Sequence, residues 1–148
     1  MILKPQQIEG AQFLADRRLA MLCDIMGFGK TAQCVHACDL VAAKRVVYVT
    51  TPAFLEGAAD QFRMWSALGY DTQIVRSGTD QLIGDGLVVV SYPMLARSEG
   101  LVARLRRRTA DVLICDEAHY LKDRRSKSAK AIFAAPGLAR AARHTWLV

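Results

Sequence analysis

The segment CDIMGFGKTAQ, residues 23–33, joins an apolar run to a helical pattern through two glycines and a Gly-Lys-Thr triplet. Gly27 and Gly29 allow the backbone conformations that wrapping a phosphate group requires, because glycine carries no Cβ. Lys30 can then reach the β and γ phosphates of a nucleotide, and the Thr31 hydroxyl can bind Mg²⁺. The segment therefore predicts a phosphate-binding loop at the start of a helix.

The rest of the chain alternates between predicted strands and predicted helices. Short apolar runs, most of them rich in β-branched residues, occupy residues 19–23, 45–50, 72–75, 87–90, 111–115 and 144–148. Apolar residues recur at helical spacing after Lys30 and in residues 53–68, where Trp65 is expected to lie in the core. Continuous apolar runs indicate strands that are buried on both faces. We therefore expect one α/β domain over residues 1–148, with a mainly parallel central sheet and helices on both faces.

Length and composition agree with one globular domain. The chain has 148 residues, of which 52% are hydrophobic, enough to build a sizeable core. No apolar run approaches the roughly 20 residues of a membrane span, and the N-terminus lacks the layout of a signal peptide. The four cysteines lie in apolar stretches rather than at the spacings of a disulfide framework. We therefore expect an intracellular protein without a membrane partner, in the cytoplasm of a bacterial or virus-infected cell or in a eukaryotic nucleus.

The net charge of +6 is unevenly distributed along the chain. Residues 1–96 hold 8 Lys/Arg and 9 Asp/Glu, a net charge of −1, whereas residues 97–148 hold 12 and 5, a net charge of +7. A one-sided basic excess is typical of a surface that binds a polyanion, although a solvated basic helix face has the same composition. The charge pattern thus favours a nucleic-acid partner without requiring one.

A second segment, DVLICDEAHYLK (residues 111–122), places two acidic residues directly after a predicted buried strand. In a parallel sheet the carboxyl ends of the strands share one edge, so Asp116 and Glu117 are expected beside the phosphate loop. One carboxylate can hold the Mg²⁺ that bridges the phosphates, and the other can orient or deprotonate an attacking water. The two segments together predict hydrolysis of a nucleotide phosphoanhydride.

These two segments resemble motifs I and II of the superfamily 2 helicase-like ATPases, and their surroundings resemble the Swi/Snf family of double-stranded DNA translocases. That family often begins motif I with Asp, which accounts for Asp24 at the position where phosphate loops commonly have glycine. Further similar segments follow in the family's order: LKPQQIEGAQFL (3–14), VVYVTTPAFL (46–55), QFRMW (61–65), VVVSYPML (88–95) and DEAHYLKDRRSK (116–127). The resemblance covers nearly the whole chain and implies a RecA-like P-loop fold.

The resemblance also implies roles for individual residues. ATP binding falls to the adenine-reading glutamine and to motif I, namely Gln7, Asp24, Gly27, Phe28, Gly29, Lys30 and Thr31. Thr31 and Asp116 would hold Mg²⁺, while Lys30, Asp116 and Glu117 would carry hydrolysis. The residues expected to bind the backbone of duplex DNA are Thr51, Ser91, Tyr92, Lys122, Arg124, Arg125 and Lys127, with Thr50 beside them. His119 would couple the nucleotide site to the DNA site.

The resemblance implies one lobe of a two-lobe enzyme. The last residues, ARHTWLV (142–148), are similar to the strand that leads into motif III, and the chain ends before that motif. A second RecA-like lobe of the full-length chain, with the arginine finger of motif VI, would complete the enzyme. Because such an arginine contributes about 10³ to 10⁵ in rate, we expect this DNA-dependent ATP hydrolase to be nearly inactive as an isolated lobe.

Other interpretations stay open at this point. Another superfamily 2 enzyme, such as an RNA helicase or the motor of a restriction system, would share both motifs, but the residues after the DEAH box resemble the duplex-DNA translocases better. A nucleotide-regulated nucleic-acid-binding module would bind Mg²⁺ and nucleotide without turnover. Locally, hydroxyl residues at strand ends also serve turns, and His119 can simply cap nearby backbone.

Overall fold

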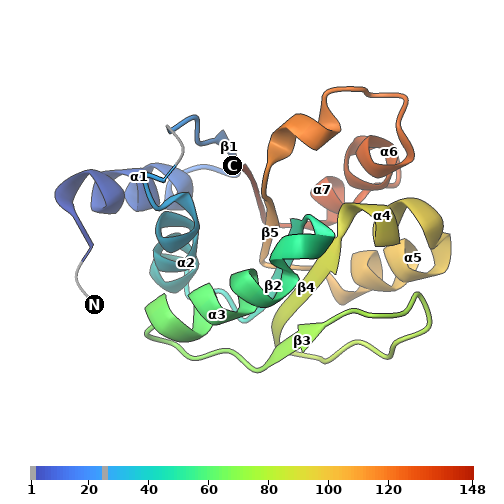
Figure 1. Cartoon of the computed structure of the whole chain (residues 1–148), viewed down its shortest axis with the longest axis horizontal. Helices are drawn as coiled ribbons and strands as arrows, with labels where there is room; N and C mark the ends of the chain where they lie inside the picture. The colour runs from blue at the N-terminus through green and yellow to red at the C-terminus, as the bar shows by residue number, and fades with distance from the viewer. Residues whose placement is uncertain (1–2, 25–26) are drawn as a thin grey trace.

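The computed structural model describes residues 3–24 and 27–148, and within them the chain forms a sheet of six parallel strands (Figure 1). The strands are β1 (Leu19–Met21), β2 (Arg45–Thr50), β3 (Thr72–Ile74), β4 (Gly86–Ser91), β5 (Val112–Cys115) and β6 (His144–Leu147). Their order across the sheet is β1-β6-β5-β2-β4-β3, and every neighbouring pair is parallel. Each strand falls on one of the apolar runs of the sequence, which confirms the predicted α/β fold.

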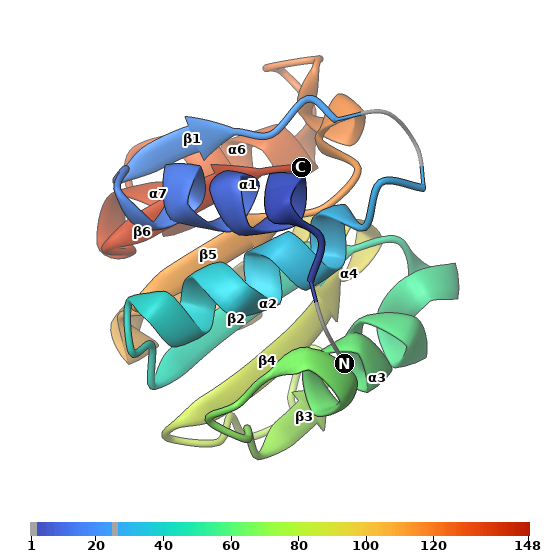
Figure 2. The same ribbon diagram turned by 90° about the vertical axis from the view of Figure 1, so that its left-hand side faces the viewer.

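Helices cover both faces of this sheet. One face carries α1 (Pro5–Ala15), α2 (Lys30–Leu40) and α3 (Leu55–Trp65), which cross in front of the strands in Figure 2. The other face carries α4 (Tyr92–Arg97), α5 (Glu99–Arg108), α6 (Lys127–Phe133) and α7 (Leu138–Ala141). Two 3₁₀ turns, η1 (Pro52–Phe54) and η2 (Ala118–Leu121), follow β2 and β5. No helix in residues 3–24 and 27–148 has the length and apolar character needed to cross a membrane.

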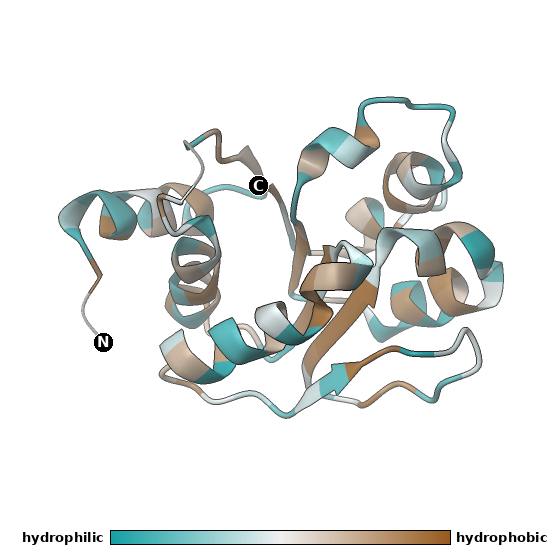
Figure 3. Ribbon diagram, in the orientation of Figure 1, coloured by the Kyte–Doolittle hydropathy of each residue, from teal (hydrophilic) through white to brown (hydrophobic). Residues whose placement is uncertain are grey.

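The sheet separates two apolar cores because successive residues of a strand point to opposite faces. In β2, Val46 and Tyr48 pack with α1, α2 and α3, whereas Val47 and Val49 pack with the helices of the other face. Trp146 of β6 is fully buried in the first of these cores. Figure 3 shows the central strands as the most continuous apolar segments of the chain. The sequence prediction of strands buried on both faces therefore holds for the centre of the sheet.

The predictions were less accurate at the edges of the sheet and at helix ends. The edge strand β1 exposes Leu19 and Met21, which are 65% and 55% accessible, and buries only Ala20 between them. The helix predicted over residues 53–68 begins as the turn η1 and ends at Trp65. Leu68, which fits the helical spacing in the sequence, lies beyond this helix and is exposed. Trp65 itself packs against the first core as predicted.

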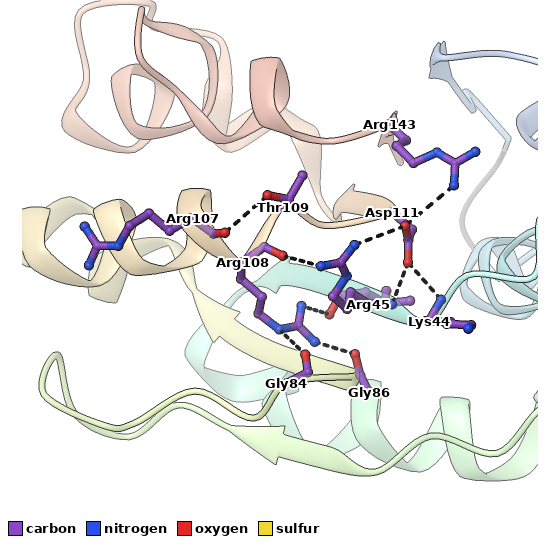
Figure 4. Close-up of polar contacts among 10 residues, drawn as sticks. Lys44, Arg45, Gly84, Gly86, Arg107, Arg108, Thr109, Asp111 and Arg143 are labelled. Atoms are coloured by element: carbon purple, nitrogen blue, oxygen red, sulfur yellow. Dashed lines mark hydrogen bonds and ion pairs between the residues drawn. The ribbon is translucent and has the colours of Figure 1, made fainter.

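The amino end of the sheet is held by arginine and aspartate side chains (Figure 4). Half-buried Arg108 donates to the carbonyl oxygens of Gly84 at 3.0 Å and Gly86 at 2.7 Å, and burial with neighbouring Arg45 lowers its pKa to about 10. Asp111 accepts hydrogen bonds from the backbone amides of residues 44 and 45, both at 2.9 Å. These bonds lie at the opposite end of the strands from the phosphate loop, so they stabilise the fold without entering the candidate site.

Candidate nucleotide-binding site

The carboxyl ends of β1, β2 and β5 bring the predicted motifs together, as parallel strands require. A cavity of about 700 Å³ opens at this edge of the sheet. Its lining combines the phosphate loop, the segment after β2 and the acidic segment after β5: Gly27, Gly29, Lys30, Thr31, Thr50, Thr51, Phe54, Gln61, Asp116, Glu117, His119 and Tyr120. Residues more than 80 positions apart in the chain therefore share one concave surface.

The phosphate loop has the backbone geometry that its glycines were expected to permit. Gly27 has φ +79° and Gly29 has φ +75°, in the left-handed region that favours glycine. The Lys30 ammonium donates a 3.0 Å hydrogen bond to the backbone carbonyl of Asp24, which closes the loop on itself. The remaining positions of this segment, 25 and 26, lie outside the described residues. Because α2 begins at Lys30, the amino end of the helix lies at the cavity that Lys30 and Thr31 line.

Gln33 positions Asp24 and was missed by the sequence analysis. Its side-chain amide, fully buried on α2, donates a 2.8 Å hydrogen bond to the Asp24 carboxylate. Gln33 follows Lys30 by three residues, so it lies about one turn further along α2 and on the side of the helix that faces the same loop. That spacing was the available signal, since a buried glutamine on an otherwise apolar helix face requires a polar partner.

Gln7, the predicted adenine reader, lies in the first turn of α1 and contacts the phosphate loop. Its side-chain oxygen accepts from the backbone amide of Lys4 at 2.9 Å, and its nitrogen donates to the carbonyl of Phe28 at 3.1 Å. A Cβ at Gly29 would stand 2.4 Å from this nitrogen, so a side chain there would displace the end of Gln7 in addition to straining the backbone angle. Gln7 and Phe28 are thus adjacent to the loop but outside the lining of the main cavity.

Asp116 is the carboxylate held most firmly in the site. The buried Thr50 hydroxyl donates a 2.9 Å hydrogen bond to its side chain, and the backbone amide of Glu117 donates another at 3.0 Å. Burial raises the pKa of Asp116 above its ordinary value, and the bond from Thr50 opposes that rise. The hydroxyl of Thr50 is therefore used inside the site, and the expectation that it bonds DNA is corrected.

A stack of rings connects Glu117 to the end of β4. The imidazole nitrogen Nδ1 of His119 lies 3.1 Å from the Glu117 carboxylate, and its ring lies 4.5 Å from that of Tyr120. Tyr120 stacks on Tyr92 at 5.6 Å, and the Tyr92 hydroxyl donates a 2.6 Å hydrogen bond to the carbonyl of Asp116. Glu117 itself has a φ of +52°, an uncommon angle for a side-chain-bearing residue. The predicted coupling residue His119 thus contacts the predicted catalytic carboxylate.

The oxygen donors in the cavity fit Mg²⁺. This cation prefers oxygen ligands and usually takes one or two from the protein, with the rest from phosphates and water. Thr31 and Asp116 both line the cavity and offer a hydroxyl and a carboxylate. The charge of a bound cation would also offset the penalty that burial places on the charged form of Asp116. The predicted metal ligands are therefore on one surface with the phosphate loop.

The structure does not gather all the predicted DNA-binding residues. Thr51 lines the cavity beside Thr50, and the side chains of Lys122, Arg124 and Arg125 are exposed in the loop before α6. Ser91 and Tyr92 are buried, and the Ser91 hydroxyl caps α4 by accepting from the amide of residue 94. With the Tyr92 hydroxyl also bonded inside the protein, these two side chains are removed from the expected DNA surface.

Lys127, the last predicted DNA residue, begins α6 and lines a separate cleft between helices. The three consecutive arginines at the end of α5, residues 106–108, also lie in different surroundings. Arg106 lines that same cleft, Arg107 is exposed, and Arg108 turns toward the amino end of the sheet (Figure 4). Successive residues of a helix point about 100° apart, so the three arginines face different surroundings.

Comparison with known proteins matches most of this chain to one family model and to parts of two much longer proteins. A family model described as "Type III restriction enzyme, res subunit" matches residues 2–140. DNA repair and recombination protein RAD54B of Gallus gallus is 29% identical over 88% of this chain but only 17% of its own length. The SWI/SNF-related matrix-associated actin-dependent regulator of chromatin subfamily A-like protein 1 of Bos taurus is 33% identical over 87% of this chain and 14% of its own length.

Solved structures show the same fold. The Sulfolobus solfataricus SWI2/SNF2 ATPase core in complex with dsDNA superposes with a TM-score of 0.79 at 17% identity, over 99% of this chain and 31% of that one. The type ISP restriction-modification enzyme LlaGI, bound to a DNA substrate mimic, gives a TM-score of 0.74 at 12% identity over 99% of this chain and 15% of that one. The chain thus spans a small part of the proteins that it matches, and the predicted RecA-like fold is confirmed.

Proposed function

Because this chain belongs to the family described as type III restriction enzyme, res subunit, and is a Swi/Snf-type superfamily 2 helicase-like lobe, we propose that it binds MgATP. Joined to a second RecA-like lobe of its full-length chain, it would couple ATP hydrolysis to movement along duplex DNA. The observation that supports this most strongly is the convergence of Lys30, Thr31, Asp116 and Glu117 on one cavity.

Each of these residues has a distinct role in the proposed reaction. The Lys30 ammonium exchanges its backbone carbonyl partner for the β and γ phosphate oxygens, which are stronger acceptors because they are charged. Thr31 and Asp116 would hold Mg²⁺, which when bound would supply positive charge to offset that of the phosphates. Glu117 orients and deprotonates the attacking water, and His119 fixes the Glu117 side chain through their 3.1 Å contact. Thr50 keeps the Asp116 carboxylate in place for the metal.

Nucleotide binding is tested by titration of a fluorescent ATP analogue in the presence of Mg²⁺. Lys30→Ala removes one charged hydrogen bond, a loss of about 1.5 to 3 kcal/mol, and should weaken binding by roughly 10- to 150-fold. Lys44→Ala is the matched control, because Lys44 is an exposed lysine at the amino end of the sheet. Equal affinity of the Lys30→Ala variant and the wild type would refute the proposed site.

DNA binding is proposed to use the exposed loop before α6, with Lys122, Arg124 and Arg125, and Thr51 near the cavity. Contacts to the DNA backbone release counterions, so affinity should fall with salt by a slope of about 0.9 per phosphate contact. Replacing the three basic loop residues with Ala should make that slope shallower in fluorescence anisotropy with duplex DNA. An unchanged slope would reject this assignment, and a preference for one sequence would reject backbone recognition.

A motor of a restriction system is the second candidate, because the matched family and LlaGI are both described as restriction proteins. A restriction motor would use the same nucleotide site as the DNA translocase proposed above, and only its biological pathway would differ. A nucleotide-regulated module without turnover differs in chemistry, and it predicts no hydrolysis even when the full-length chain is assayed with DNA. Measurement of phosphate release by the full-length chain therefore separates the enzyme from the module.

A further inference from the structure

A second cleft lies between α5 and α6, on the face of the sheet opposite α1, α2 and α3. Its volume is about 780 Å³, larger than that of the cavity at the nucleotide site. Helix α5 contributes positions 99, 102, 103 and 106, and α6 contributes positions 127, 130 and 131, with position 134 directly after it. Because residues three and four apart share one helix face, the cleft is formed by one whole face of each helix. None of its lining residues belongs to the nucleotide cavity.

The floor of this cleft is apolar. Leu95 of α4 lies at its base and is 2% exposed, and Val102 of α5 and Ala131 of α6 are half-buried beside it. Beyond α6, the exposed residues Ala135 and Pro136 extend the apolar surface at one end of the cleft. Surface of this kind gains free energy when an apolar group covers it.

The rim of the cleft is strongly basic. Arg97, Arg106, Lys127 and Lys130 line it, against a single acidic residue, Glu99. Within residues 3–24 and 27–148 these four basic side chains make no ion pair or side-chain hydrogen bond, unlike Arg108 or Arg45 at the amino end of the sheet. Their charges are therefore available to a ligand, and part of the basic excess of residues 97–148 is concentrated here.

We propose that this cleft binds an acidic, amphipathic peptide segment of a partner protein. The apolar floor takes the apolar face of the segment, and the four cations pair with carboxylates along its edges. A duplex DNA backbone fits less well, because its phosphates would lose hydration against the apolar surface of Val102 and Ala131 without gaining an apolar contact. The loop with Lys122, Arg124 and Arg125 suits DNA better, because all three side chains project from an exposed loop; Lys122 and Arg124 also line a smaller cavity with Leu121 and Phe133. The C-terminal third of the chain thus carries two basic surfaces with different partners.

The test uses a fluorescein-labelled helical peptide of about 14 residues, roughly four turns, with leucine on one face and glutamate on the other. A second peptide of equal charge has serine in place of each leucine. The leucine peptide should bind the wild-type protein in fluorescence anisotropy, and the serine peptide should bind at least about tenfold more weakly. Equal binding of the two peptides would overturn the proposal, because attraction by charge alone needs no apolar cleft.

Charge reversal locates the binding surface. Arg106→Glu with Lys130→Glu should weaken binding of the leucine peptide about tenfold or more, because two attractions become repulsions. The control is Arg18→Glu with Arg140→Glu, which changes the net charge equally beside a separate, smaller cavity. The proposal fails if both double variants lose affinity equally, or if reversal in the cleft weakens duplex DNA as much as peptide. If the Glu variant does not fold, Arg106→Gln with Lys130→Gln removes the same charges, and undiminished peptide binding by that variant would also overturn the proposal.

Discussion

The hydrogen bond from Thr50 to Asp116 has a measurable effect on stability. Thr50 is fully buried, and its hydroxyl donates to the Asp116 carboxylate at 2.9 Å. Valine has nearly the same shape as threonine, so Thr50→Val removes the hydroxyl without leaving a cavity. A hydrogen bond to a charged group contributes about 1.5 to 3 kcal/mol, compared with about 0.5 to 1.5 kcal/mol for a neutral one. We expect Thr50→Val to lower the free energy of unfolding by about 1.5 to 3 kcal/mol at neutral pH.

The pH dependence of this loss follows from the raised pKa of Asp116 in the folded protein. The folded state holds that proton to higher pH than the unfolded state, whose pKa is near the ordinary 3.8. The contribution of Asp116 to the free energy of unfolding is therefore complete below pH 3.8, and it declines as pH rises through the pKa of Asp116 in the folded protein. Without the Thr50 hydroxyl the pKa rises further, so the deficit of Thr50→Val relative to the wild type grows as pH increases.

Urea unfolding near pH 4 and near pH 7.5 measures the deficit at both ends of this range, since the charged fraction of the Asp116 carboxyl in the folded protein increases between the two pH values. For a chain of this size, about 1.5 to 3 kcal/mol corresponds to a fall in Tm of roughly 3 to 12 °C. Thr50→Ser keeps the hydroxyl and loses one methyl group, so its cost of about 1 kcal/mol should not depend on pH. A Thr50→Val variant as stable as the wild type, or with equal deficits at both pH values, would refute the role assigned to Thr50.

Three further changes test other parts of the structure. Arg108→Met should lower the free energy of unfolding by about 1.5 to 3 kcal/mol in urea, while leaving nucleotide affinity unchanged, because its carbonyl partners lie at the amino end of the sheet; reduced affinity would contradict this separation. Gly29→Ala should weaken nucleotide binding about tenfold, since its φ of +75° and the 2.4 Å approach to Gln7 both oppose a Cβ. Gly84→Ala, where a Cβ meets nothing within 4 Å, should have no effect on that titration and serves as the control. The isolated lobe should bind ATP with almost no phosphate release in the presence of DNA, and robust release that Glu117→Gln abolishes would contradict the need for a second lobe.

The order of the elements and the chemistry of the motifs were determined by the sequence alone. Six apolar runs separated by helical patterns indicate a parallel sheet, because its central strands are covered by helices on both faces and are therefore apolar along their length. Gly27, Gly29 and Lys30 identify the phosphate loop because their side chains, or lack of them, are chemically suited to that conformation. Asp116 and Glu117 were placed beside the loop by the rule that parallel strands end at one edge.

The partners of individual polar side chains were decided only by the tertiary structure. A hydroxyl at a strand end has the same local sequence whether it faces solvent or a neighbouring strand, so Thr50 and Tyr92 could not be distinguished from surface residues. Basic residues in one part of the chain likewise separate when helices turn, and Lys127 faces a cleft while Arg124 stays in an exposed loop. Local sequence determines which hydrogen bonds and charges a residue can offer, whereas the packing of distant elements determines which of them remain available at the surface.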